Sequence, residues 1–510
     1  MSETENKRVN IGYRTVFCLV IFALFLWYLY IFSQMPYTHD DWDWGLSNGI
    51  EQLCSANINS RYVGNFLIVL LTRSEAFRNL FMAAVSAAIP VCLVKLSGCR
   101  GRVTIALLLF MNGLILSQSG GIWRETYGWT SGFANYVVSG LAVLLYLSAV
   151  ERAFAGKKAG RGYLLLLVIF SVGIQLFIEN LTIWLLASGV MLLLLALVMR
   201  RAIVEMTAML AGLSVGTAIM FSSSVYKSLS ETGMAIGGYR QITVSVEDGL
   251  GSMVSTVLSQ LKWNISNLYC GQFKLSACLL LVLAVLFFVH ACRRTQDLRS
   301  KLGMLALTGV DLALIALLWL VKSRGITGSW VALPGLTVFT VVLIQLLLLR
   351  FAFSERSYLY YAYIWLSMLL LYLPLTVTST CGERVFLLPM IMQLLLTAKL
   401  IGQLCSCFPK IENDRRAVAA ALAAALLLSW GPMVRKTLDY HRIGETKKGQ
   451  IACIEQAKQN GADEIVLPAY DYDLEEEYLW YPHPEGEARK SFFKQFYGID
   501  NDVALSFSAG

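Results

Sequence analysis

A short stretch near the amino terminus, Tyr37 to Asn65, holds the residues of this sequence best suited to chemistry. Asp40, Asp41 and Asp43 stand together in HDDWDWG, and Arg61 follows in NSRYVGN. A carboxylate can accept a hydroxyl proton as a general base, and an arginine can hold a phosphate through two parallel hydrogen bonds. Adjacent residues on a helix point about 100° apart, so Asp40 and Asp41 cannot both address one atom. We expect one of them to be the base, while the other orients it, binds substrate or holds a metal.

Later loops carry further charged residues that could bind a substrate in the same site. They are Arg124 and Glu125 in the glycine-containing loop SQSGGIWRETYGWTSGFANY, Glu179 in IENLT, Lys322 and Arg324 in KSRGITGSW, and Glu383 and Arg384 in TSTCGERVF. Structural alternatives stay open for them: Glu179 could cap a helix, and the Arg and Lys side chains could reach lipid headgroups. The rings of Trp42, Trp44, Trp123 and Trp129 could stack on sugars or anchor the chain at a membrane interface.

The elements that position these residues must lie in a membrane. Of 510 residues, 56% are hydrophobic and only 15% charged, with a mean hydropathy of +0.59. Apolar runs near the length of about 20 residues that a bilayer requires recur up to residue 432. Helices satisfy their own backbone groups in lipid, so we predict an all-α polytopic fold. Its thirteen predicted spans cover residues 12–33, 76–97, 103–118, 134–152, 163–178, 181–199, 202–221, 274–291, 302–321, 331–349, 357–375, 386–403 and 417–432.

The distribution of positive charge predicts the orientation of these spans. With the amino terminus in the cytoplasm, the inner loops hold just over half of the 42 basic residues, as the positive-inside rule requires. The net charge of +8 then lies at the inner face, beside anionic lipids, and the sequence has no nucleic-acid-binding motif. We therefore predict a multi-pass protein of the cell membrane, with a first outer loop over 34–75 and an extracytoplasmic carboxyl terminus.

Two domains are predicted from the change in composition after Trp430. Residues 1–436 form the transmembrane domain, and residues 437–510, which are polar and acidic, form a small outer α/β domain. Within it we predict a helix over Gln450–Asn460, a strand over Glu464–Leu467 and an aromatic helix over Ser491–Tyr497. The acidic run Asp471–Glu477 is typical of a solvated face.

On this topology the charged candidates gather at the outer ends of the spans. Ionisable groups so near hydrocarbon are costly unless they pair or line a wet cavity, so they are functional candidates. They suit the transfer of a sugar from a lipid phosphate, with an aspartate as base and arginines on the phosphate. Asp311, inside the ninth span, is expected instead to be a packed polar residue bonded to a neighbouring helix. His39 stands alone and favours a structural role over metal binding.

These motifs resemble a family pattern. An inner amino terminus, one span and an outer loop that opens with HDDWDWG resemble the GT-C superfamily of integral-membrane glycosyltransferases. With NSRYVGN, YGWTSGFANY, IEN, CGERVFLLP and FYGID, the sequence is similar over nearly its whole length to a bacterial family of GtrII-like glucosyltransferase membrane proteins that has no settled activity. The resemblance implies inverting hexosyl transfer from a polyprenyl-phosphate sugar to a surface glycan, polymer or lipid, with Asp40 or Asp41 as base. Some GT-C groups use a divalent metal such as Mg²⁺ or Mn²⁺ at this loop and others use none, so the cofactor stays open.

Two other functions compete with the enzyme. A transporter or flippase of a lipid-linked sugar would also place charged groups near lipid phosphate. It would more naturally show broken helices, inverted repeats and polar groups near the midplane of the bilayer, where only Asp311 is expected here. An assembly partner in envelope polymer synthesis would leave the outer carboxylates without a task.

Overall fold

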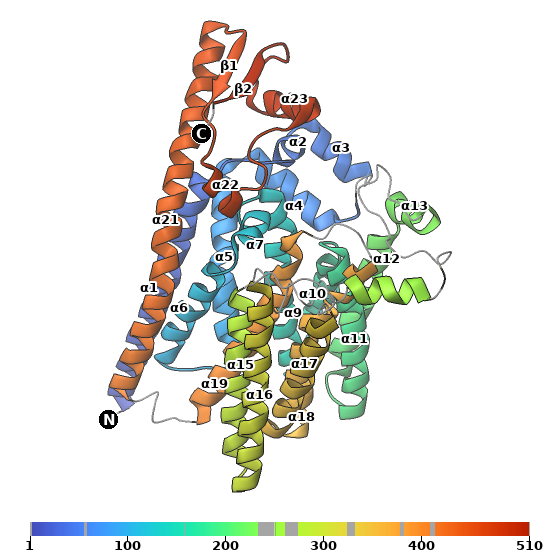
Figure 1. The fold of residues 1–510 in the computed structure, drawn as a ribbon, viewed down its shortest axis with the longest axis vertical. Helices are drawn as coiled ribbons and strands as arrows, with labels where there is room; N and C mark the ends of the chain where they lie inside the picture. The colour runs from blue at the N-terminus through green and yellow to red at the C-terminus, as the bar shows by residue number, and fades with distance from the viewer. Residues whose placement is uncertain are drawn as a thin grey trace.

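The computed structural model describes residues 3–55, 59–157, 159–232, 249, 251–260, 274–323, 332–377, 382–407 and 414–508. These residues are almost entirely helical (Figure 1). The amino-terminal part contains α1 (Glu3–Gln34), α2 (Asp41–Gly45), α3 (Ser47–Ser55), α4 (Tyr62–Arg73), α5 (Glu75–Ser97), α6 (Val103–Leu116), α7 (Gly120–Thr126), α8 (Thr130–Gly132), the π-helical turn η1 (Phe133–Val137) and α9 (Val138–Phe154).

The remaining elements continue the helical bundle and then leave it. The bundle is completed by α10 (Arg161–Gln175), α11 (Glu179–Met199), α12 (Ile203–Phe221), α13 (Ser224–Thr232), a helix over 251–260, α15 (Lys274–Arg294), α16 (Leu298–Ser323), α17 (Ala332–Ala352), α18 (Glu355–Leu370), η5 (Leu373–Val377), η6 (Glu383–Phe386) and α19 (Leu387–Cys407). The carboxyl-terminal part contains α21 (Arg415–Asn460), β1 (Glu464–Leu467), α22 (Tyr472–Tyr478), α23 (Gly486–Tyr497) and β2 (Ala504–Phe507).

The prediction of an all-α membrane protein is confirmed. Each of the thirteen predicted spans falls on a helix, and within the described residues nine helices are long and apolar enough to cross a bilayer. A tenth span results if α6 and α7, which meet at a bend of 92°, are counted together. Apolar side chains such as Phe22 and Leu427 remain exposed on the outside of the bundle, where lipid would cover them. The number of crossings and the side on which each terminus lies stay predictions.

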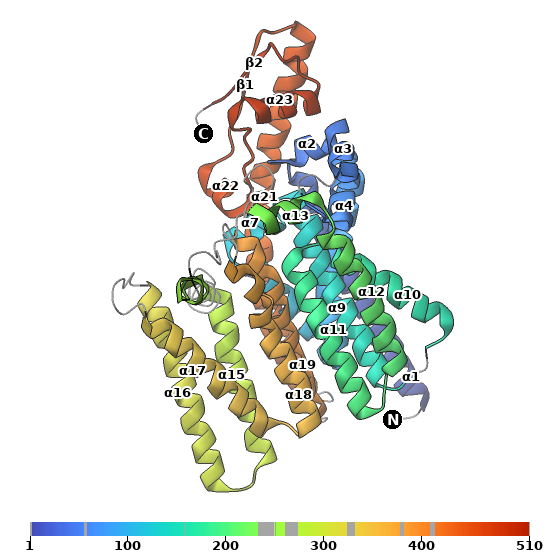
Figure 2. The ribbon, with the colours of Figure 1, turned by 90° about the vertical axis from the view of Figure 1, so that its right-hand side faces the viewer.

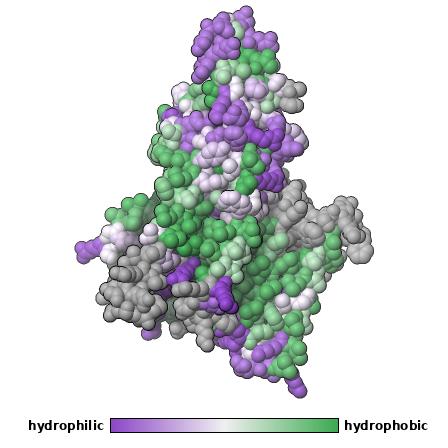
Figure 3. All heavy atoms as spheres, turned by 90° about the vertical axis from the view of Figure 1, so that its left-hand side faces the viewer, coloured by the Kyte–Doolittle hydropathy of each residue, from purple (hydrophilic) through white to green (hydrophobic). Residues whose placement is uncertain are grey.

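Hydrophilic surface gathers at the end of the molecule that lies away from the amino terminus. Figure 3 shows an apolar surface over the helical part and a hydrophilic surface over the carboxyl-terminal elements above it. In Figures 1 and 2, β1, β2 and α23 lie at this end, next to α2 and α3 of the predicted first outer loop. This arrangement brings the acidic stretch near the amino terminus together with the last residues of the chain.

Helix α21 links the two regions without a break. The predicted span 417–432 and the predicted helix Gln450–Asn460 are parts of this single helix of 46 residues, which contains Pro432 and ends at Gly461. Gly461 has a left-handed conformation with φ of 61°, which glycine adopts without the steric cost of a Cβ atom. Because α21 continues through residue 437, no interruption of the helix marks the predicted domain boundary.

The carboxyl-terminal elements share a hydrophobic core with the first outer loop. The predicted strand over Glu464–Leu467 is confirmed as β1, and it pairs in parallel with β2, with Glu464 opposite Ala504. The aromatic helix expected over Ser491–Tyr497 forms the second half of α23. Its Phe493 lies against the fully buried Trp42, at 5.2 Å between ring centroids. This shared core fixes α23 over α2 and so sets one wall of the cavity described next.

Candidate functional site

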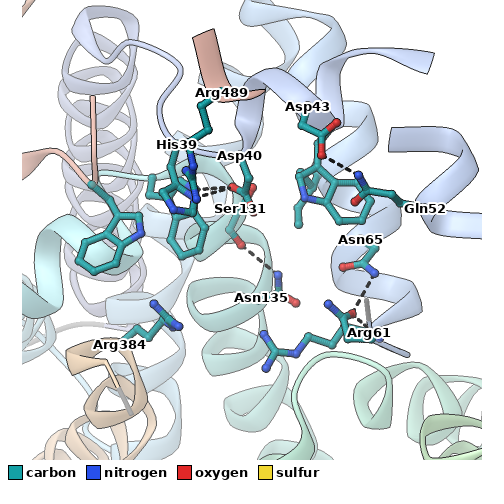
Figure 4. A pocket seen from close by; sticks show the side chains of 15 residues that line it. His39, Asp40, Asp43, Gln52, Arg61, Asn65, Ser131, Asn135, Arg384 and Arg489 are labelled. Atoms are coloured by element: carbon teal, nitrogen blue, oxygen red, sulfur yellow. Dashed lines mark hydrogen bonds and ion pairs between the residues drawn. The ribbon is translucent and has the colours of Figure 1, made fainter. Parts of the chain in front are cut away.

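A cavity of about 380 Å³ opens between the region of α2 to α4, the ends of helices in the bundle and the carboxyl-terminal part (Figure 4). It is lined by His39, Asp40, Asp43, Trp44, Gln52, Asn59, Arg61, Asn65, Ile68, Trp129, Ser131, Asn135, Arg384, Trp480 and Arg489. Four of the predicted site residues are therefore brought together in one place: Asp40, Asp43, Arg61 and Arg384. Figure 4 shows Asp40 and the two arginines Arg61 and Arg384 on facing sides of this space.

Asp40 presents a carboxylate to the cavity. About a third of its side chain is exposed (34%), and its Oδ1 accepts a hydrogen bond from Nε1 of Trp129 at 2.9 Å, with Nδ1 of His39 at 3.6 Å. Burial alone would raise the pKa of Asp40, but the nearby His39 and the hydrogen bonds of Ser131 and Trp129 outweigh it and lower the pKa below its usual value. Asp40 is therefore ionised near neutral pH and ready to accept a proton.

Asp41 faces away from the cavity and is fully buried. Its carboxylate accepts four hydrogen bonds: from the backbone N–H groups of Thr38 (3.2 Å), Thr130 (3.3 Å) and Ser131 (3.0 Å), and from the Ser131 hydroxyl (2.8 Å). Thr130 and Ser131 begin the continuous helix Thr130–Phe154, whose first N–H groups have no partner within the helix. Asp41 supplies that partner, and its negative charge suits the positive end of the helix dipole. The geometry gives Asp41 a positioning role and leaves Asp40 as the candidate base.

Asp43 and the tryptophans have distinct surroundings. The Asp43 carboxylate accepts hydrogen bonds from the side-chain amides of Asn48 and Gln52, the latter at 2.6 Å. Trp44 and Trp129 line the cavity, as the stacking hypothesis for sugar rings requires. Trp42 and Trp123, which the sequence offered for the same role, are fully buried and inaccessible to a ligand.

Arg61 reaches the cavity from the amino-terminal end of α4. Its Nε and Nη2 atoms donate to the two carboxylate oxygens of Glu179, at 3.2 and 2.8 Å. Both side chains are mostly buried, at 14% and 19% exposure. Glu179 begins α11 and also accepts a hydrogen bond from the hydroxyl of Tyr226. Glu179 therefore orients Arg61. Helix capping and substrate contact both stay open as further roles of Glu179.

Arg384 lies on the same side of the cavity as Arg61, in the 3₁₀ turn η6 that precedes α19. Its backbone N–H and its Nη1 donate to Oε2 of Glu125, at 3.3 and 3.2 Å. Glu125 is 3% exposed and comes from α7. The Arg384 guanidinium also lies 5.6 Å from the ring of Trp129, whose indole N–H bonds Asp40. Trp129 thereby connects the acidic and basic sides of the site.

Of the other predicted residues, Arg124 and Glu383 lie outside this cavity. Arg124 pairs with Glu476 of α22 at 2.7 Å and lines a neighbouring cavity, so the acidic run is more than a solvated face. Glu383 accepts a weak hydrogen bond from the Ser119 hydroxyl at 3.4 Å and packs on Gly121. Lys322 lies near the end of α16, outside the side chains that the structure describes, and Arg324 lies outside the described residues.

The carboxylates do not form a metal-binding set. Within the described residues, no three His, Cys, Asp or Glu side chains lie close enough to hold one ion. Asp43 accepts two amide hydrogen bonds and Asp41 accepts four, so their oxygens are already occupied by donors. The residues present do not fit a divalent cation, and no step below involves one.

Asp311 behaves as the sequence predicts. Its Oδ2 accepts a hydrogen bond from Nε2 of Gln345 at 3.0 Å, and Gln345 Oε1 accepts one from the indole of Trp365 at 2.9 Å. The group lies within the helical bundle and not at the cavity. Asp311 is confirmed as a packed polar residue bonded to a neighbouring helix.

Several lining residues were not predicted from the sequence. Five of them carry uncharged amide or hydroxyl side chains: Gln52, Asn59, Asn65, Ser131 and Asn135. Two more, Trp480 and Arg489, come from the carboxyl-terminal part. Asn135 lies in the π-helical turn η1, a distortion found often at functional sites, and its Oδ1 has no hydrogen-bond partner among the described residues. The glycine-containing loop was a usable signal for Ser131 and Asn135. Nothing in the local sequence marks Trp480 or Arg489.

Comparisons with known proteins give no further guide, since no family model, curated protein or solved structure matches the chain.

Proposed function

We propose that this protein is a membrane glycosyltransferase that moves a hexose from a polyprenyl-phosphate sugar to a surface glycan, polymer or lipid. The observation that carries the proposal is the cavity in which the ionised carboxylate of Asp40 faces the guanidinium groups of Arg61 and Arg384. A sugar phosphate bound to the two arginines would place its anomeric carbon between them and Asp40. Such a cavity offers both the base and the anion site that sugar transfer from a phosphate requires.

The reaction balances with these residues alone. Asp40 accepts the proton of an acceptor hydroxyl, and the acceptor oxygen forms a bond to the anomeric carbon on the face opposite the phosphate. The bond between that carbon and the phosphate oxygen breaks, and its electron pair leaves with the polyprenyl phosphate. Arg61 and Arg384 stabilise the negative charge on the leaving group through charge-assisted hydrogen bonds. Attack from the opposite face inverts the anomeric configuration.

The position of the arginines suits a donor that arrives from the lipid. Arg61 precedes α4 and Arg384 precedes α19, which is one of the helices able to span a bilayer. The acceptor would arrive from the hydrophilic end of the molecule (Figure 3). On the predicted orientation this end lies outside the cytoplasmic membrane, where an envelope glycan is accessible.

The test is the surface glycan composition of cells that carry Asp40→Asn, with protein abundance checked by blot. The variant keeps the size of the side chain but removes the base, so we expect normal abundance and a loss of one sugar substituent by at least about 100-fold. The exposed Asp473→Asn in α22 removes a carboxylate elsewhere and should leave the glycan unchanged. If the Asp40→Asn cells keep every glycan at the wild-type level, Asp40 is not the base and the proposal is wrong.

Purified protein in lipid vesicles separates the enzyme from the transporter. Given a polyprenyl-phosphate sugar, the enzyme should release polyprenyl phosphate only when an acceptor is added. A transporter should instead move the intact lipid-linked sugar between leaflets without any release. An assembly partner would do neither.

A further inference from the structure

The carboxyl-terminal part builds one wall of the cavity and holds it in an unusual conformation. The backbone N–H of His39 donates to the carbonyl oxygen of Tyr481 at 3.1 Å. Both residues have left-handed backbones, with φ of 55° for His39 and 46° for Tyr481. Residues with a Cβ atom seldom adopt this conformation, and where they do it is concentrated at functional sites. The contact therefore fixes the segment that carries Trp480 and Tyr481 to His39, the residue before the candidate base.

This wall presents aromatic rings. The ring centroids of Trp129 and Trp480 are 6.2 Å apart, and those of Trp480 and Tyr481 are 4.6 Å apart. Trp480 is half-buried and Tyr481 is 46% exposed, so part of each ring is accessible. Amphipathic aromatic faces of this kind pack against the C–H groups of sugar rings while leaving the hydroxyls free to bond elsewhere.

Arg489 differs from the other arginines around the site. Arg61, Arg384 and Arg124 each pair with a glutamate, Glu179, Glu125 and Glu476 respectively. Arg489 is half-buried in α23, and among the residues that the structure describes no carboxylate lies within ion-pair distance of it. A partly desolvated guanidinium without a carboxylate is a binding group for an anion.

Arg489 also lies on the acceptor side of the cavity. Figure 4 shows it near His39 and Asp40, across the space from Arg61 and Arg384. A donor phosphate held by Arg61 and Arg384 therefore leaves Arg489 for a different anion. The group closest to the base on this side is the acceptor, because Asp40 must reach the acceptor hydroxyl.

The space continues beyond the first cavity along the same segment. A neighbouring cavity of about 230 Å³ shares Trp480 with it, and another of about 280 Å³ shares His39 and Arg489. Both further cavities are also lined by Tyr481, His483 and Glu485. An acceptor longer than one sugar could follow this path away from the membrane helices.

We propose that the wall formed by Trp480, Tyr481 and Arg489 is the acceptor subsite, and that its ligand is an anionic saccharide whose carboxylate or phosphate group binds Arg489. The sugar ring lies against the aromatic faces, and its free hydroxyl is directed toward Asp40. This inference rests on the proposed function, since it names the acceptor class of the same site. Carboxylate and phosphate groups share the chemistry that Arg489 recognises, and the experiment below distinguishes them.

The test is direct binding by purified full-length protein in detergent, read from tryptophan fluorescence, because Trp480 and Trp129 report on the subsite. The probes are glucuronic acid, glucose 6-phosphate and neutral glucose. We expect one of the two anionic sugars to saturate the signal at a concentration at least about 10-fold below that of glucose, a difference that corresponds to one charge-assisted contact. The anion that shows this preference identifies the source of the charge.

Variants assign the preference to Arg489. Arg489→Gln should bind all three sugars equally, and Arg489→Lys, which keeps the charge, should retain part of the preference. Lys490→Gln removes a positive charge from the neighbouring residue of α23 and should bind as the wild type does. Thermal unfolding of each variant shows whether the protein is folded, and the Lys variant keeps the test informative if the Gln variant is not.

Three results would overturn the inference. They are equal affinity of the wild type for charged and neutral sugars, no saturable binding of any of the three, or a preference that survives in Arg489→Gln. The readout needs no catalysis, so it is independent of the proposed function. If Asp40→Asn abolishes a glycan substituent while Arg489→Gln keeps the preference, the proposed function is supported and the proposed acceptor subsite is wrong. If the preference depends on Arg489 while Asp40→Asn changes no glycan, the saccharide site stands and the enzyme falls.

Discussion

The guanidinium of Arg61 is held by Glu179, a residue 118 positions further along the chain, through two nearly parallel hydrogen bonds at 3.2 and 2.8 Å. Both side chains are largely shielded from water, so this pair is screened less than a surface ion pair. Its two-pronged geometry fixes the plane of the guanidinium as well as its position. Arg61 is therefore pre-oriented before any ligand enters the cavity.

Removal of this orienting partner should cost both stability and activity. Glu179→Gln removes the carboxylate that accepts two hydrogen bonds from the mostly buried Arg61, and we expect a loss of about 1–3 kcal/mol in the free energy of unfolding. The shift in thermal midpoint, measured at one scan rate in detergent, tests this. The double variant Arg61→Gln, Glu179→Gln should lose less than the sum of the two single variants, because each single change already breaks the same pair. If the loss in the double variant equals the sum of the losses in the two single variants, the pair is not coupled.

The two adjacent aspartates should respond to truncation in different ways. Asp41→Ala removes the acceptor of four hydrogen bonds at a buried site, so we expect it to destabilise the protein by several kcal/mol or to reduce its abundance. Asp40→Ala removes the indole hydrogen bond and the interactions with His39 and Ser131 from a side chain that is partly exposed, and the cost should be about 1 kcal/mol. Thermal midpoints and glycan composition of both variants give the comparison. A pair of variants with the same stability would contradict the assignment of Asp41 as a positioning residue.

The pH dependence of stability should carry a contribution from Asp41. Burial and the adjacent charge of Asp40 raise the pKa of Asp41 from its usual range near 4 to about 6. Between about pH 4 and pH 6 the folded protein then binds more protons than the unfolded chain, so stability falls as pH rises through this window. The variant Asp41→Asn has no such titration.

The difference in thermal midpoint between wild type and Asp41→Asn measures this contribution. The thermal midpoint of the wild type should fall relative to that of Asp41→Asn between about pH 4 and about pH 6, and the difference should stay constant above about pH 6. The same measurement on Asp473→Asn serves as the control, since that residue is exposed. A difference that does not change with pH would mean that Asp41 keeps an ordinary pKa.

The contact between α7 and the carboxyl-terminal part leaves no room for a side chain at Gly128. A Cβ atom at this position, just after α7, would clash with the carbonyl oxygen of Tyr478, which is backbone and cannot rotate away. Gly128→Ala should therefore displace the segment that leads to Trp480, with a loss of about 1–3 kcal/mol. Gly303→Ala in α16, where no atom lies within 4 Å of the new Cβ, should be neutral or stabilising. Limited proteolysis after residue 460, together with thermal unfolding, compares the two; equal behaviour would contradict the close contact.

The sequence was informative where local pattern determines structure. Apolar runs predicted the positions of the helices, and the density of carboxylates at Asp40 to Asp43 led to the cavity. The adjacency of Asp40 and Asp41 predicted that they would point apart. Which of the two faces the cavity depends on the backbone N–H groups of Thr130 and Ser131, which come from a helix far along the chain. That choice could not be read from either neighbourhood alone.

Trp480 and Arg489 show the limit most clearly. They lie some 440 residues from Asp40 in sequence and reach it only because α23 shares a hydrophobic core with Trp42. A tryptophan and an arginine in a polar tail carry no pattern of their own. The pair of Arg61 and Glu179 is likewise long-range. The chemistry of each residue predicted that both belong to the site, but not that they pair with each other.

The uninterrupted course of α21 joins the apolar helical bundle directly to the hydrophilic carboxyl-terminal part. At about 1.5 Å per residue, its 46 residues extend about 69 Å, with no loop to act as a hinge within that length. The rotation of the carboxyl-terminal part about the axis of α21 is thus fixed relative to the bundle. One residue inserted after Pro432 would rotate the part of α21 that follows it, and the elements attached to that part, by about 100°. Ile454 of α21 and Trp42 of α2 belong to the same hydrophobic core, so α21 and the segment next to Asp40 hold the wall that carries Trp480 and Arg489 from two sides.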